Sequence, residues 1–195
     1  MSMIRMRASI AFHPLSAALV AGCLAGSIGH AGTYPLLLTV DARATTPTAN
    51  IVSSVKIRVD KLMEENRRTR VNDALKRNGY TGFLTTLRTL PRVGTIEVSA
   101  RTVDIRYAHE APEGSGRRLV LVADRPLFFL GGAPSKSRDG YELTIVDLRF
   151  DAAGAVVGTM AGAARVKPAP DGGVVLDDYA EAPVQLTPRA LRPHF

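Results

Sequence analysis

The chain has 195 residues, one cysteine and a formal net charge of +7 at neutral pH. This length allows about one domain with its own core, and a single cysteine excludes an internal disulfide. The basic balance would suit anionic lipid headgroups or nucleic acid, but charges of both signs are interspersed along most of the chain, which favours simple solubility.

The first 31 residues have the layout of a secretory signal peptide. Arg5 and Arg7 form a short positive start, and an uncharged apolar run of small residues extends from Leu15 to Ile28. The run is shorter than the roughly 20 apolar residues of a transmembrane helix. The pattern therefore predicts export, which makes nucleic acid an unlikely partner. A buried N-terminal helix is the alternative.

Two cleavage sites compete within this segment. Residues 20–23, Val-Ala-Gly-Cys, fit the bacterial lipoprotein pattern, in which Cys23 would be acylated and would carry a lipid anchor. Residues 29–31, Gly-His-Ala, fit an ordinary signal-peptidase site, so that the mature chain would begin at Gly32. The sequence leaves the choice open. The predicted location is the periplasm or the outer membrane.

The predicted elements after residue 31 begin with strands at 34–40 and 51–60; the second alternates apolar and polar residues cleanly. Residues 61–70 are polar and charged, as in an exposed loop or a helix start. A short helix is expected over 71–78, with Gly79 just after its end, and a second over 81–90, stopped by Pro91.

From residue 93 onward the pattern is that of β-structure. Strands are expected at 94–98, 101–107, 118–122, 127–130, 141–150, 155–167, 174–176 and 183–186. The strand at 118–122 is apolar on both faces, which predicts a central position. The strand at 155–167 is rich in Gly and Ala, which would suit either a bend in the sheet or close packing of a helix.

Strands that follow one another with short connections favour an antiparallel meander. We expect an α+β domain over residues 32–187, built from a curved sheet or partial barrel with two short helices packed on it. Residues 188–195 form a Pro/Arg-rich tail.

The sequence holds few candidates for catalysis. His109 is the one histidine inside the predicted domain, and Glu110 follows it. Adjacent strand residues point to opposite faces, so a surface histidine is favoured over a hydrolase that uses His109 and an acid. The chain shows no zinc-type His/Cys spacing, no Gly-x-Ser-x-Gly elbow and no phosphate-binding Gly-rich loop. We expect neither catalysis nor a cofactor or metal.

Acidic residues gather at Asp177, Asp178 and Glu181, with Asp171 nearby. Their oxygens could hold Ca²⁺, but the spacing lacks the register of an EF-hand loop, so a solvated turn or ion pairs with arginine are favoured.

Two further groups are candidate contact residues. Phe128 and Phe129 precede two glycines and could line an apolar ligand mouth, although a core anchor is favoured. Arg67, Arg68 and Arg70 form a basic cluster that could face an anionic membrane surface.

Several blocks of the β region carry a resemblance, and they lie at 93–98, 106–110, 116–132 and 177–183. Together they resemble an uncharacterised family of exported bacterial proteins, over roughly residues 70–187. The resemblance implies a bacterial envelope location and assigns no functional residue.

The sequence thus predicts an exported envelope protein that acts as a non-catalytic binding or structural module, with an envelope protein or an anionic membrane surface as its partner. A periplasmic carrier of a lipid or other apolar ligand is the alternative. A carrier would need an apolar cavity of at least a few hundred Å³.

Overall fold

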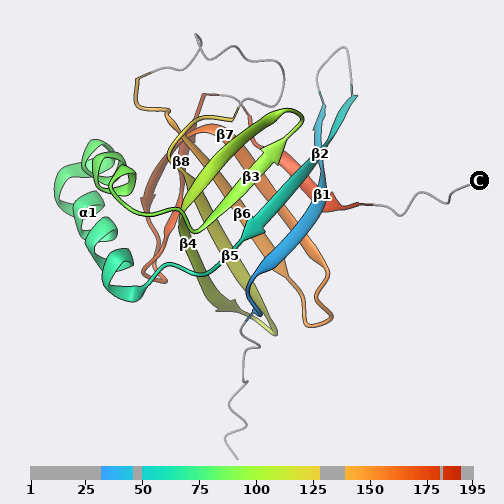
Figure 1. The fold of residues 1–195 in the computed structure, drawn as a ribbon, viewed down its shortest axis with the longest axis horizontal. Helices are drawn as coiled ribbons and strands as arrows, with labels where there is room; N and C mark the ends of the chain where they lie inside the picture. Colours follow the sequence, from blue (N-terminus) through green and yellow to red (C-terminus); the bar gives the residue numbers. More distant parts are fainter. Residues whose placement is uncertain (1–31, 46–49, 128–138, 181, 190–195) are drawn as a thin grey trace, which may run out of the picture.

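The computed structural model describes residues 32–45, 50–127, 139–180 and 182–189. They form a closed antiparallel barrel with one helical element on its outside (Figure 1). The elements are β1 (Leu36–Thr45), β2 (Asn50–Val59), α1 (Glu65–Arg88), β3 (Gly94–Val98), β4 (Arg101–Glu113), β5 (Gly116–Ala123), β6 (Leu143–Phe150), β7 (Val156–Pro168), β8 (Val174–Tyr179) and β9 (Val184–Pro188).

The strands run as an up-and-down meander. Each strand from β1 to β7 pairs antiparallel with the next, and β9 then pairs with both β7 and β1, which closes an eight-stranded barrel. Strand β8 stands outside this circle, because β7 is long enough to pair with β9 through 158–160 and with β8 through 164–168. The predicted antiparallel sheet is confirmed, but closure replaces the predicted partial barrel.

Apolar side chains fill the inside of the barrel. Alternate residues of the strands point inward, as the period of two requires. The interior members include Ile57, Ile96, Leu121, Leu148 and Met160, all almost fully buried. Eight strands give an interior that side chains can fill or that can hold one small ligand, and here the described inward side chains form one apolar cluster.

A second apolar cluster lies outside the barrel, beneath α1. The helix contributes residues that include Val71, Leu75 and Phe83, the segments on either side of it contribute Met63 and Leu90, and the remaining members lie on the outer faces of β4–β8. Strand β5 lies between the two clusters: Leu121 belongs to the inner one and Val122 to the outer one. This arrangement explains why its sequence is apolar on both faces.

The structure corrects the prediction of two short helices. One element, α1, runs from Glu65 to Arg88, and it is interrupted only at Gly79, whose φ of 64° and ψ of −160° are non-helical. The sequence placed a helix end at Gly79, but the chain re-enters a helix immediately, so a bend replaces a separating loop. Glycine reaches this backbone conformation because it has no Cβ.

The start of α1 was also placed too late, because its first turn is polar. Glu64 pairs with Arg67 at 3.2 Å and Glu65 with Arg68 at 2.6 Å, both at the i,i+3 spacing of a helix. Within the described residues, no helix combines the length and the apolar character that crossing a bilayer requires.

Candidate functional site

Three places outside the packed interior carry polar chemistry or open space, and the first surrounds His109. This residue lies on the outer face of β4 beneath the N-terminal half of α1. The tight turn between β7 and β8 folds over it: a methyl group added at Gly173 would overlap the His109 ring. Tyr107, two residues back on the same face, has its ring centroid 6.5 Å from that of His109.

Three buried polar atoms lie in this region without a hydrogen-bond partner among the described residues. They are Nε2 of His109, the hydroxyl of Tyr107 and Oδ1 of Asn72 on α1. Asn72 is held in place by its Nδ2, which donates to the carbonyl of Gly172 at 2.6 Å. Buried polar groups are nearly always paired, so three unpaired atoms mark a place where polar packing is incomplete.

Burial and charge change the acidities in this cluster. Burial lowers the pKa of His109, and the nearby positive charge of Arg68 lowers it further, while Asp171 opposes the shift. Burial also raises the pKa of Tyr107 to about 12. Both groups are therefore neutral at neutral pH.

The hydrolase alternative required His109 to hydrogen-bond an acid. Its chain neighbour Glu110 points into the barrel, as the alternation of strand residues demands. Asp171 is near His109, but its Oδ1 accepts from the backbone N–H of Gly173 at 2.9 Å, and His109 Nε2 has no partner within the part of the chain that the structure describes.

The second place is the end of the barrel where β1 begins. Glu110 and Arg117, on neighbouring strands, form an ion pair there, and their side chains are 9% and 16% exposed. The Arg117 guanidinium lies 4.0 Å from the centroid of the Phe150 ring. Tyr34 donates to Glu110 Oε2 at 2.7 Å, and the backbone N–H of Gly32 donates to Oε1 at 2.8 Å.

These contacts keep the carboxyl group of Glu110 ionised. Burial alone would raise its pKa, but the hydrogen bonds from Gly32, Tyr34 and Arg117 lower it below the usual value. A recess of about 300 Å³ lies beside this ion pair, between the first described residues and the turns that follow β4 and β6.

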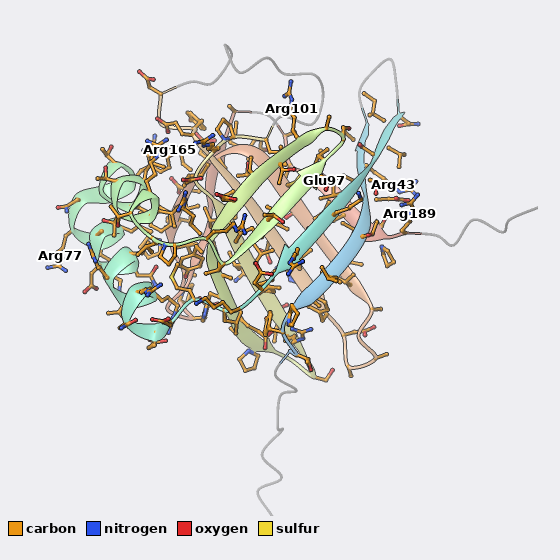
Figure 2. All side chains as sticks on the ribbon, in the orientation of Figure 1. Arg43, Arg77, Glu97, Arg101, Arg165 and Arg189 are labelled. Carbon is orange, nitrogen blue, oxygen red and sulfur yellow. The ribbon has the colours of Figure 1, made fainter. Side chains whose placement is uncertain are left out.

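The third place is a groove of about 370 Å³ on the outer face of β1, β2 and β3. Leu37 lies in it and is 68% exposed, the largest exposed fraction among the described large apolar residues. Charged side chains line the rest: Lys56 pairs with Glu97 at 3.0 Å, and Arg58 pairs with Asp60 at 2.6 Å. Figure 2 places Glu97 on this face, away from Arg77 on α1.

The basic cluster predicted from the sequence lies on α1, where two of its members are paired. Arg67 contacts Glu64, and Arg68 contacts Glu65 and donates to the carbonyl of Gly172 at 2.7 Å. Arg70 is exposed. The pairing leaves this segment less positive than its arginine content suggests.

Other predicted contacts are placed elsewhere. Asp177 pairs with Lys167 at 3.4 Å, and Asp178 accepts from Tyr141 at 2.5 Å. The described residues contain no group of three or more acidic, His or Cys side chains arranged to hold a metal ion. Cys23, Phe128, Phe129 and Glu181 lie outside the described residues.

Sequence reasoning did not identify the ion pair of Glu110 and Arg117 or the groove at Leu37. Both depend on which face of each strand points into the barrel, and an alternating sequence pattern does not show that the sheet closes into a barrel. The apolar residue Leu37 inside an otherwise apolar stretch gave no signal, because such a run does not say which member is exposed.

Comparison with protein-family models, with curated proteins and with solved structures gives no match. The geometry of the described residues alone therefore defines the class of fold, a closed antiparallel barrel with one external helical element. This fold is compatible with a non-catalytic binding role or a carrier role.

Proposed function

We propose that this protein is an exported bacterial envelope protein and a non-catalytic binding module, which contacts an envelope protein through the groove at Leu37. The observation that carries the proposal is the exposure of Leu37 in a recess on the side of the barrel that α1 leaves uncovered (Figure 1).

The composition of the groove supports a protein partner. An apolar centre with a charged rim is the usual anatomy of a protein–protein contact, whereas an anionic membrane surface would favour unpaired basic side chains. In the groove, Lys56 and Arg58 each have an acidic partner. The rim can therefore fix the orientation of a partner, while Leu37 supplies the apolar contact.

The apolar cluster inside the barrel supports binding on the outside rather than inside the barrel. The inward side chains belong to one continuous apolar cluster. A carrier would have to open this cluster, and each displaced large side chain would forfeit its burial, worth about 1.5–3 kcal/mol. Export rests on the signal-peptide pattern and on the resemblance to exported bacterial proteins.

Photo-crosslinking in the intact envelope tests the contact. A photoreactive residue replaces Leu37 in one variant and Val157 in another; Val157 is also exposed, at 53%, but lies on β7, away from the groove. We expect a discrete crosslinked species from position 37 and none from position 157. A further Arg58→Glu change in the groove should reduce the crosslink.

Equal crosslinking at both positions, or none at either, would contradict the proposed contact. Native mass spectrometry of the protein purified from the envelope tests the carrier alternative. Extra mass that is lost on denaturation would favour a carrier and count against a binding module with a filled interior.

A further inference from the structure

The backbone nitrogen of Gly32, the first described residue, donates a hydrogen bond to the carboxylate of Glu110. Glu110 has two carboxylate oxygens with different partners. Oε2 accepts from Tyr34 and Arg117, whereas Gly32 N is the single donor to Oε1 among the described residues, at 2.8 Å. The nitrogen of Gly32 thus donates the third described hydrogen bond to an ionised carboxylate that is largely buried.

This nitrogen is also the atom that a signal peptidase would release at one of the two predicted cleavage sites. Residues 29–31, Gly-His-Ala, directly precede Gly32 and fit the pattern for such cleavage. In the hydrolysis, water gives its hydroxyl to the Ala31 carbonyl carbon and a proton to the Gly32 nitrogen, and at neutral pH the new amine takes up one further proton.

We propose that the chain is cleaved after Ala31 and that the new α-ammonium group of Gly32 binds Glu110 at this end of the barrel. This inference rests on the proposed export and chooses between the two cleavage sites. The backbone contact seen at Gly32 then becomes a charge-assisted hydrogen bond, which is about twice as strong as a neutral one.

The surroundings suit a charged N-terminus. The recess of about 300 Å³ borders Gly32, so the ammonium protons that Glu110 does not accept can remain hydrated. Arg117 shares the carboxylate, but it is directed to the other oxygen, and its guanidinium lies over the Phe150 ring. A methyl group at residue 32 would overlap the Arg117 guanidinium, which fits glycine at the first position.

The first experiment is the intact mass of the full-length gene product after expression in a bacterium and purification from the envelope. We expect a chain that begins at Gly32. A chain that begins at a lipid-modified Cys23 would overturn this inference and leave export standing. A chain that retains residues 1–31 would overturn both this inference and the proposed export.

The second experiment measures how fast an amine-reactive reagent labels the α-amine near pH 7. A bound ammonium group has a raised pKa and should react slowly. We expect labelling several-fold faster in Glu110→Gln than in the unaltered protein. Glu113→Gln is the matched control, because Glu113 is exposed at the end of the same strand and pairs with Arg149 at 3.0 Å.

Glu110→Asp guards against a folding defect of the first variant. It keeps the charge that Arg117 needs but withdraws the carboxylate by one methylene, so labelling should again be faster than in the unaltered protein. Equal rates in Glu110→Asp, Glu113→Gln and the unaltered protein would overturn the binding of the ammonium group by Glu110, even if cleavage after Ala31 is found.

Discussion

The two faces of strand β5 are both buried, yet they face different kinds of packing. Inside the barrel, Leu121 belongs to the apolar cluster that the inward side chains form. On the outer face, Val120 and Val122 belong to the cluster beneath α1, where Tyr107 also lies with an unpaired hydroxyl. The interior is a uniform scaffold, whereas the helix-covered face mixes apolar contacts with incomplete polar ones.

This difference indicates that polar groups are matched less completely beneath α1 than in the barrel interior. The described interior is lined mainly by apolar side chains, and Glu110 and Arg117 satisfy each other at its end. The interface of α1 is built from a helix, a sheet face and the β7–β8 turn, and polar atoms from all three must be matched at once. Three of them are left without partners.

The largest expected effect on stability is that of Leu121→Ala in the barrel interior. Leu121 is fully buried, and we expect the change to lower the free energy of unfolding by about 2–5 kcal/mol, because it leaves a cavity that close packing cannot refill. Urea unfolding followed by circular dichroism measures it. Leu37→Ala, at an exposed position, should change stability by less than about 0.5 kcal/mol. Similar losses in both variants would contradict the packed interior.

A smaller effect of the opposite sign is expected at Tyr107. Because its buried hydroxyl has no partner, Tyr107→Phe should raise the free energy of unfolding by about 1 kcal/mol. The matched control is Tyr80→Phe, since the Tyr80 hydroxyl donates to Glu142 Oε2 at 2.7 Å and accepts from Glu142 N–H at 2.9 Å. That variant should lose about 1 kcal/mol.

A loss of stability in Tyr107→Phe would contradict the expectation that the Tyr107 hydroxyl is unpaired. It would mean that the hydroxyl is hydrogen-bonded in solution, either to the neighbouring Asn72 side chain, which acts to lower the pKa of Tyr107, or to a bound water. Calorimetric unfolding of the two tyrosine variants side by side distinguishes these outcomes.

The smallest expected effect is the pH dependence that His109 contributes. Its folded pKa lies below the usual value of 6.5, so the unfolded chain binds the proton more tightly. The stability is therefore fully present above that value and is lost as the pH falls through it toward the folded pKa. Burial is the largest cause of the lowered pKa; Arg68 and Arg118 add to it, and Asp171 and Glu65 oppose it.

The measurement compares urea unfolding at about pH 7.5 and pH 5.5, on either side of the ordinary histidine pKa. We expect His109→Gln to lose less stability than the unaltered protein when the pH is lowered. An equal loss of stability in the two proteins would show that His109 has the same pKa in the folded and the unfolded state.

Much of the barrel could be predicted from the residues alone. Alternation marked β2, and the doubly apolar β5 was correctly predicted to be central, because the side-chain period of a strand is local information. The helical stripe of Phe83, Leu84 and Leu87 was likewise visible, and so was the break at Gly79. The first turn of α1 was missed, since its stabilising pairs are polar and carry no apolar signal.

The candidate sites depended more on tertiary structure. His109 stood out by its rarity, but its burial beneath α1 and its proximity to the β7–β8 turn join segments more than 60 residues apart, 109 and 171–173. Glu110 and Arg117 are seven positions apart in sequence and become partners only because β4 and β5 turn the same face inward.

The sequence by itself determined much of the local structure: most of the strands, the break in the helical segment at Gly79, and the antiparallel order that short connections impose. Only the tertiary structure decided that the sheet closes through β9, which strand faces are the inside, and which apolar residue, Leu37, stays exposed. The physical reason is that periodicity records the faces of each strand, whereas closure depends on twist and register summed over the whole sheet.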